Sequence, residues 1–204
     1  TFTDLSHVKS LQRYTISSQM VLDEATKLNL EILQPQRGTN KRHTLLYLLD
    51  KTKTAMGGRL LRKWLAAPLI DIQRIQRRQD AVEALLAQDL RESIQVNLQA
   101  VYDLERLAGK LAQLTISPKS LKSMAESILY LPTIFDQLRP LDAFKGFIPE
   151  EIPTDSANEI LSALLEDTPI SINEGRIFLE GYNTELDELR TLTTEVKLAI
   201  AQME

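Results

Sequence analysis

The residues that could carry out chemistry in this 204-residue chain are few, and their spacing builds no catalytic site. The two histidines, His7 and His43, do not have the spacing of metal ligands, and the absence of cysteine rules out a disulfide framework. The phosphate-binding patterns G-x-x-x-x-G-K-S/T and G-x-G-x-x-G are absent, as is the nucleophile pattern G-x-S-x-G. Adjacent acids such as Glu150–Glu151 and Asp187–Glu188 are typical of solvated charge or of a helix N-terminus. The sequence therefore predicts no catalytic, metal or cofactor site.

One glycine pair, Gly57–Gly58, could be interpreted as a phosphate loop because basic residues follow it. We favour instead a helix that is capped by Thr54 and ends near Ala66, since Pro68 disfavours its continuation. The two glycines would let this helix pack closely against a neighbour. Trp64 is spaced with leucines along the helix, which predicts a core residue rather than a base-stacking platform. The apolar face of the helix would comprise Leu60, Leu61, Trp64 and Leu65.

Charge is distributed unevenly along the chain, although the net charge is only -4. Residues 37–78 contain 11 lysines and arginines against two acids, whereas residues 150–204 contain 13 acids against three basic residues. A basic segment of this kind can face a polyanion. It can equally attract an acidic region of the same fold, or form the solvated face of a helix.

Hydrophobic residues recur mostly at the spacing of helices. Asp71 is expected to cap a helix that ends near Gln88, and two shorter stripes follow it between residues 90 and 114. Ser117 and Pro118 have the pattern of N-cap and first helical residue, and Pro132 should end or bend the helix that they begin. Residues 139–153 read as a loop, after which Thr154 or Asp155 begins another helix. The fold class expected is mainly α, a multi-helical orthogonal bundle with one long projecting helix.

Strand signals are few and predict a small β ribbon of two or three strands at most. Leu11–Ile16 and Gln19–Leu22 would form two of them, and Arg176–Leu179, between two glycines, is a candidate to pair with one of these.

The last predicted helix begins at the N-cap Asn183 and runs to Glu204. Apolar residues follow it at alternating steps of three and four, which is the spacing of a coiled-coil seam. No stop signal follows, so we expect the chain to be part of something longer. An uncovered seam predicts self-association, or a helix that folds back or frays. The seam comprises Leu186, Leu189, Val196, Ile200 and Met203, with Thr193 at the remaining position.

Five ordered segments of the chain carry a resemblance to a known family: VLDEATKLNLEI (21–32), TLLYLLDKTKTAMGGRLLRKWLAAPL (44–69), RQDAVEALL (78–86), DLERLAGKLA (103–112) and GYNTELDELR (181–190). Together they resemble the core domain of the MutS family of DNA mismatch-repair proteins. The resemblance covers almost the whole chain. Phe178-Leu179-Glu180 matches the letters of the family's mismatch-reading Phe-x-Glu, but it lies in the wrong domain, and we interpret the match as coincidence.

The resemblance implies a division of the chain into three parts. Residues 1–13 would be the exit from the connector, residues 14–182 the helical core, and residues 183–204 the start of a lever helix that is cut before the clamp. The mismatch-binding, clamp and ATPase domains would lie outside the chain. This fragment would then have no catalytic site, and would act as a structural and allosteric module between the ATPase domain, the DNA clamp and the mismatch-binding domain.

Further expectations concern the parent protein that the resemblance implies. It would be a cytoplasmic, DNA-dependent ATPase that uses ATP and Mg, is a homodimer, and binds mismatched double-stranded DNA and a MutL-type partner. No apolar run is long enough for a membrane span. The alternative is a stand-alone helical module that binds nucleic acid or protein. The candidate contacts with DNA or with another domain are Arg59, Arg62 and Lys63.

Overall fold

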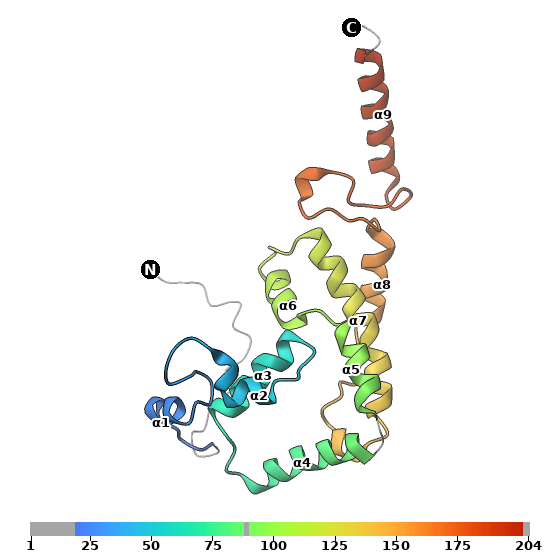
Figure 1. Cartoon of the computed structure of the whole chain (residues 1–204). Coiled ribbons are helices and arrows are strands. Elements are labelled where there is room, and N and C mark those ends of the chain that lie inside the picture. Colours follow the sequence, from blue (N-terminus) through green and yellow to red (C-terminus); the bar gives the residue numbers. More distant parts are fainter. Residues whose placement is uncertain (1–18, 88–89, 202–204) are drawn as a thin grey trace, which may run out of the picture. The chain divides into compact units, whose positions relative to one another are not determined.

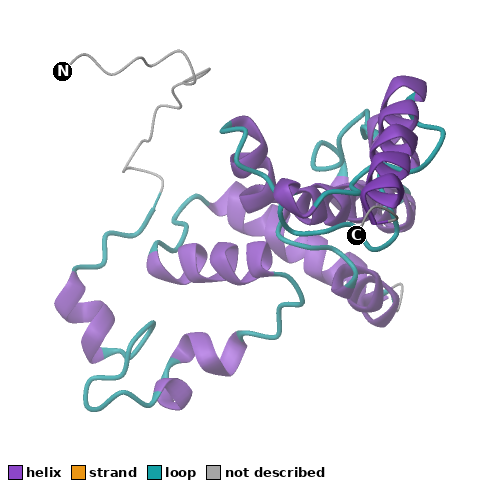
Figure 2. Cartoon of the chain, turned by 90° about the horizontal axis from the view of Figure 1, so that it is seen from above, coloured by secondary structure: helices purple, strands orange, loops and turns teal. Residues whose placement is uncertain are grey.

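The computed structural model describes residues 19–87 and 90–201, and over these ranges the chain is mainly helical, as predicted (Figures 1 and 2). The chain divides into two compact units. The first contains Thr1–Thr52 and Gly57–Ala87, and the second contains Lys53–Met56 and Gln88–Glu204.

The first unit is built from short helices, several of which begin at a side-chain cap. The Asp23 carboxylate accepts a hydrogen bond from the Thr26 amide at 2.6 Å, and Asp71 accepts one from the Arg74 amide at 3.1 Å, as the sequence predicts for Asp71. The elements are α1 (Glu24–Asn29), η2 (Lys41–His43), α2 (Leu45–Leu49), α3 (Ala55–Ala66), of which the part from Gly57 belongs to this unit, and α4 (Ile72–Ala87).

The described core of the first unit is small. Ile32 and Thr44 are buried, and the amide of Leu46 donates to the Ile32 carbonyl at 3.0 Å, which fastens the start of α2. Most other large apolar side chains of this unit stay partly exposed, as at Leu48 in α2. Burial of apolar area is the main driving force for folding, so this unit has a modest stabilising core of its own.

Gly58 in α3 lies where the chain passes close to its own preceding loop. A Cβ atom at this position would lie 3.3 Å from Oγ1 of Thr52. Thr52 Oγ1 donates to the Asp50 carboxylate at 2.6 Å, which fixes its position. The interpretation of the glycine pair as a close-packing site is therefore confirmed at Gly58.

The second unit is a helical bundle around a long helix, α7, with Ser117 and Pro118 in the predicted roles at its start. Pro132 does not end α7, which continues to Leu138. Ile134, beyond the proline, is buried, so packing against neighbouring helices outweighs the lost amide hydrogen bond. The elements are α5 (Arg91–Gln99), α6 (Leu104–Ala112), α7 (Pro118–Leu138), η3 (Asp142–Phe144), α8 (Thr154–Ala163), η4 (Ile172–Glu174) and α9 (Thr184–Ala201).

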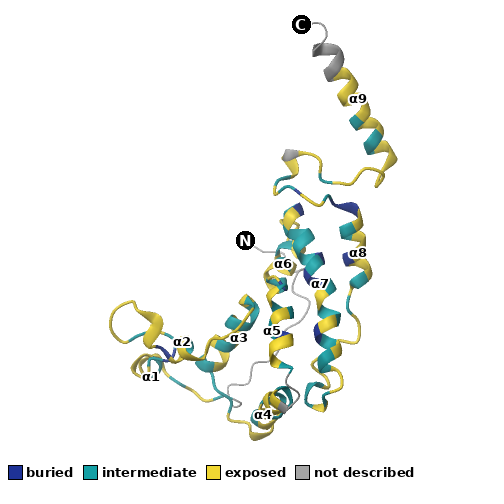
Figure 3. Ribbon diagram, turned by 45° about the vertical axis from the view of Figure 1, so that its right-hand side comes forward, coloured by how far each residue is buried: buried dark blue, intermediate teal, exposed yellow. Residues whose placement is uncertain are grey.

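The core of the second unit lies between α7 and α8, which form its most extensive helix contact (Figure 3). Ala125 and Ala157 are fully buried, and their small side chains let the two helices approach closely around Ile128. The hydroxyl of Ser127, also fully buried, accepts from the Tyr102 amide at 3.0 Å and donates to the Ser123 carbonyl at 2.7 Å. This serine ties the α5–α6 connection to α7.

The predicted pairing of Arg176–Leu179 with Gln19–Leu22 is wrong. Isolated antiparallel bridges join Gln19 to Leu69 and Leu164 to Phe178, and no longer ladder forms among the described residues. Phe178 pairs with the chain that leaves α8, because α8 brings Leu164 within reach while Gln19 belongs to the other unit. Leu11–Ile16 lie outside the described residues.

Candidate functional site

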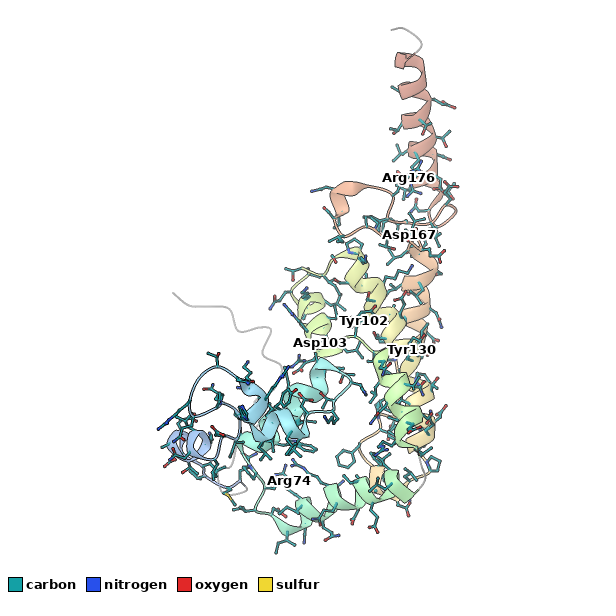
Figure 4. The ribbon with its side chains drawn as sticks, viewed as in Figure 1. Arg74, Tyr102, Asp103, Tyr130, Asp167 and Arg176 are labelled. Carbon is teal, nitrogen blue, oxygen red and sulfur yellow. The ribbon has the colours of Figure 1, made fainter. Side chains whose placement is uncertain are left out.

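The clearest polar network of the second unit surrounds the start of α9, where Arg176 is labelled in Figure 4. Asn183 caps the helix as predicted, accepting from the Leu186 amide at 3.0 Å. Asp187, in the first turn of the helix, accepts from the Gly181 amide at 2.6 Å and from Arg190 Nη1 at 3.0 Å. The network therefore holds the incoming chain against the first two turns of the helix.

Arg190 joins this helix to the chain that follows α8. Its Nη2 donates to the Phe178 carbonyl at 3.1 Å, in addition to the ion pair with Asp187. The Phe178 ring stacks on Tyr182 with centroids 5.4 Å apart and an interplanar angle of 6°. Hydrogen bonds to a charged guanidinium are stronger than neutral ones, so Arg190 is the main polar anchor of α9.

The bridge between Leu164 and Phe178 continues the connection back to α8. The Leu165 amide donates to the Ile177 carbonyl and the Leu179 amide donates to the Ala163 carbonyl, each at 2.9 Å. Leu164 is buried at the end of α8. We name residues 163–168 and 177–190 the α8–α9 junction.

The long helix α7 reaches the same junction through Lys122. Its Nζ donates to the carbonyl of Leu165 at 3.0 Å and to that of Glu166 at 2.5 Å. The Thr168 hydroxyl also donates to the Leu165 carbonyl. A continuous path of contacts therefore runs from α7 through the bridge to Arg190 and α9.

A groove of about 780 Å³ lies between this junction and α9. Apolar and polar side chains both line it. The lining residues are Leu165, Arg176, Phe178, Glu180, Leu186, Asp187, Leu189, Arg190, Thr191, Thr193 and Thr194.

The predicted apolar seam of α9 lies largely in solvent in the single chain. Leu186 is half-buried in the groove, but Leu189 is 55% exposed and Val196 is 57% exposed. None of the extensive helix contacts recorded among the described residues of this unit involves α9, and folding back of the helix stays a prediction. Self-association stays a prediction. The side chain of Ile200 and the whole of Met203 lie outside the described residues.

Three threonines of α9 bind their own backbone. The hydroxyls of Thr191, Thr193 and Thr194 each donate to the carbonyl four residues before, at 3.0, 2.7 and 2.9 Å. These bonds are a common arrangement for hydroxyl side chains within a helix.

The basic candidates predicted from the sequence lie in the first unit, on α3. Arg59, Arg62 and Lys63 are all exposed. Within the described ranges no ion pair is recorded for Arg62 or Lys63, so their charges face solvent. The three side chains are therefore accessible, and their contact with DNA or with another domain stays a prediction.

Trp64 corrects the prediction of a core aromatic. The side chain is 39% exposed, and the Arg78 guanidinium of α4 covers its ring at 3.6 Å from the centroid. Burial of Arg78 lowers the pKa of its guanidinium, and the nearby charge of Arg74 lowers it further. The apolar face of α3 is larger than the small core of this unit can cover. The indole therefore stays at the surface, where the Arg78 cation packs on its ring.

Comparison with known proteins identifies the family of the chain. The family described as MutS domain III matches residues 25–204. The chain belongs to the MutS domain III family.

Several proteins called DNA mismatch repair protein MutS are similar to this domain III chain over 98% of its length. The proteins from Alkaliphilus metalliredigens and Alkaliphilus oremlandii are 41% and 42% identical to it, and that from Bacillus subtilis is 39% identical. The chain spans 23% of the length of the Alkaliphilus metalliredigens protein and 24% of the Bacillus subtilis protein. The resemblance noted in the sequence is thereby confirmed.

The roles of two residues in the α8–α9 junction, Asp187 and Lys122, were missed by sequence reasoning. Asp187 was interpreted only as an acid that favours the helix N-terminus, and its spacing of three from Arg190 was the available signal. Lys122 carries no sequence signal, because its acceptors are backbone carbonyls 43 and 44 residues away. Among the described residues no group of His, Asp or Glu could hold a metal ion, and no helix there is long and apolar enough to cross a membrane.

Proposed function

We propose that this chain is the core-and-lever module of a DNA mismatch-repair protein, in which α9 is the lever and the α7–α8 pair is the core that holds it. The observation that supports this proposal is the continuous path from Lys122 through the Leu164–Phe178 bridge to Arg190. Such a path can transmit a displacement between the core and the far end of α9.

Coupling between sites also requires an element with two arrangements that ligands favour differently. The α8–α9 junction is suited to be that element, because one bridge and a few side-chain bonds are what hold it in the described part of the chain. The Asp187–Arg190 pair is partly exposed, at 30% and 27%, and such pairs contribute little to stability. The buried α7–α8 interface is held by packing instead, so the junction is the weaker of the two.

We also propose a wider role for the parent protein, which the relatives' description as DNA mismatch repair proteins supports only as far as mismatch repair itself. We propose that the complete protein binds mismatched double-stranded DNA and hydrolyses ATP with Mg²⁺ in a separate domain. A homodimer, a MutL-type partner and a cytoplasmic location belong to the same proposal. Domain III would link the ATPase domain to the DNA clamp and the mismatch-binding domain, and would itself have no catalytic site.

The test is to weaken the junction in the complete protein and to measure ATP hydrolysis with and without mismatched DNA. Arg190→Ala should reduce the response of hydrolysis to mismatched DNA and leave the rate without DNA unchanged. Arg139→Ala is the matched control, because Arg139 forms an ion pair at the same spacing with Asp136, at 3.7 Å, away from the junction. An unaltered DNA response in the Arg190 variant would count against the lever role.

A second candidate function, contact with DNA, is favoured by the accessible cations of α3. Contacts with phosphates would be independent of sequence and steeply salt-dependent. In filter binding by the complete protein, the triple variant Arg59→Ala, Arg62→Ala, Lys63→Ala should lower the affinity and flatten the salt slope. A variant of equal charge change, Arg91→Ala, Arg106→Ala, Lys119→Ala, is the control in the second unit.

If the triple variant binds DNA like the control, the α3 cations contact another domain or solvent instead. The alternative of a stand-alone binding module has its own test. Measurable binding of DNA by the 204-residue chain alone at low salt would support that alternative over the lever role.

A further inference from the structure

The ammonium group of Lys122 is bound by backbone carbonyls. The side chain is half-buried at the end of the α7–α8 interface, and its ammonium donates to two backbone carbonyls, those of Leu165 and Glu166. No ion pair with a carboxylate is recorded for it among the residues that the structure describes. The carbonyls lie directly after α8, and a cation at a helix C-terminus interacts favourably with the helix dipole.

The Leu165 carbonyl is itself held in place. It accepts a second hydrogen bond from the hydroxyl of Thr168, a residue that is only 6% exposed. The amide of the same Leu165 donates to the Ile177 carbonyl, which is one of the two backbone bonds of the bridge. One residue, Leu165, therefore links Lys122 on one side to the strand-like segment before α9 on the other.

We propose that Lys122 is a positioning residue that acts as a latch: while it binds the carbonyls of Leu165 and Glu166, the bridge stays closed and α9 keeps one direction relative to α8. When the latch opens, the bridge loosens and α9 samples other directions. This proposal rests on the proposed lever function for its biological meaning, but its geometry can be tested without the rest of the protein.

The direct test measures the distance between α8 and α9 in the 204-residue chain. Because the chain has no cysteine, Asn158→Cys and Glu188→Cys introduce unique sites for spin labels, and both native residues are exposed. We expect a narrow distance distribution in the otherwise unaltered chain. Lys122→Met should broaden it, whereas Lys122→Arg should keep it narrow because a guanidinium can still donate to both carbonyls.

The matched control is Lys119→Met, which removes an exposed cation from the preceding turn of α7. It should leave the distribution unchanged. If Lys122→Met does not fold, Lys122→Gln serves in its place, since glutamine is shorter and uncharged. A Lys122 variant that folds and keeps the narrow distribution overturns the proposal.

Amide hydrogen exchange gives an independent reading of the bridge. Loss of hydrogen bonds from a charged donor should raise the exchange rates of the Leu165 and Leu179 amides by about tenfold or more. The Ile128 amide in the α7–α8 core should be unaffected, whereas a general loss of stability would accelerate all three. Equal acceleration of the three amides would therefore contradict a latch.

The two proposals fail in different ways. If Lys122→Met broadens the distance distribution but the complete protein with this change keeps its normal response to mismatched DNA, the latch stands and the lever function does not. If the distribution stays narrow while Arg190→Ala abolishes the DNA response, the lever function stands and the latch is wrong.

Discussion

The guanidinium carbon of Arg78 lies 3.6 Å from the centroid of the Trp64 ring, so an arginine of α4 covers one face of an aromatic residue of α3. A cation over an exposed indole contributes about 0.5–1 kcal/mol. The contact joins two helices of a unit whose described core is small, and it is therefore a larger share of that unit's stability than it would be in a well-packed domain.

Replacing Arg78 should uncover the indole. Because Trp64 is the only tryptophan in the chain, its fluorescence reports on this site alone. Arg78→Met should change the emission of Trp64. In Arg78→Ala, acrylamide should quench the Trp64 fluorescence more strongly than in the unaltered chain. Arg74→Ala, on the same helix, removes a neighbouring charge without touching the ring, and should leave acrylamide quenching unaltered.

Two helical glycines should respond differently to alanine. Gly109 in α6 has open space where a Cβ would lie, so Gly109→Ala should stabilise the chain by up to about 1 kcal/mol through helix propensity. Gly58→Ala brings the new Cβ to 3.3 Å from Thr52 Oγ1, which should cancel that gain. Urea unfolding measures both, and a stabilising Gly58→Ala that matches Gly109→Ala would refute the close packing.

The buried hydroxyl of Ser127 should be costly to remove. Ser127→Ala removes the acceptor of the Tyr102 amide, and the loss of a hydrogen bond of this kind costs about 0.5–1.5 kcal/mol. Ser162→Ala removes an exposed hydroxyl that donates to the Glu159 carbonyl, and should have a much smaller effect. The difference between the two variants in free energy of unfolding checks the prediction.

Acid should weaken the N-terminus of α1. Hydrogen bonds from Thr26 lower the pKa of the Asp23 carboxyl. A lowered pKa in the folded state stabilises the chain above the ordinary pKa of aspartate, about 3.9, and this contribution is lost as the pH falls through the folded value. Asp23→Asn keeps a good cap but does not titrate. In the unaltered chain, protection of the Thr26 amide from hydrogen exchange should therefore fall as the Asp23 carboxylate is protonated. In Asp23→Asn this pH dependence should be lost.

The helices of this chain were largely predictable, because their signals are local. Ser117–Pro118 and Asn183 begin helices through interactions within one turn, and hydrophobic spacing sets the faces. Pro132 shows the limit of local reasoning. Its helix continues through it because Ile134 is buried by residues distant in sequence.

The candidate site was predictable only in part. The accessible cations of α3 and the apolar stripe of α9 follow from composition and spacing. The latch at Lys122 does not, because backbone carbonyls accept hydrogen bonds whatever side chain they carry, and so leave no trace in the sequence. Trp64 was misassigned because helical spacing identifies an apolar face but not whether enough neighbours exist to cover it.

The threonine hydroxyls of α9 have a consequence for the transfer of this helix out of water. An unpaired hydroxyl loses its hydration when a helix face is covered, and that loss opposes association. Thr191, Thr193 and Thr194 already donate to carbonyls of their own helix, so their donors would remain satisfied in a dry environment. The desolvation penalty for covering this stretch of α9 is correspondingly low. The helix can therefore pass between a solvent-exposed state and a state buried against another surface at little cost in free energy.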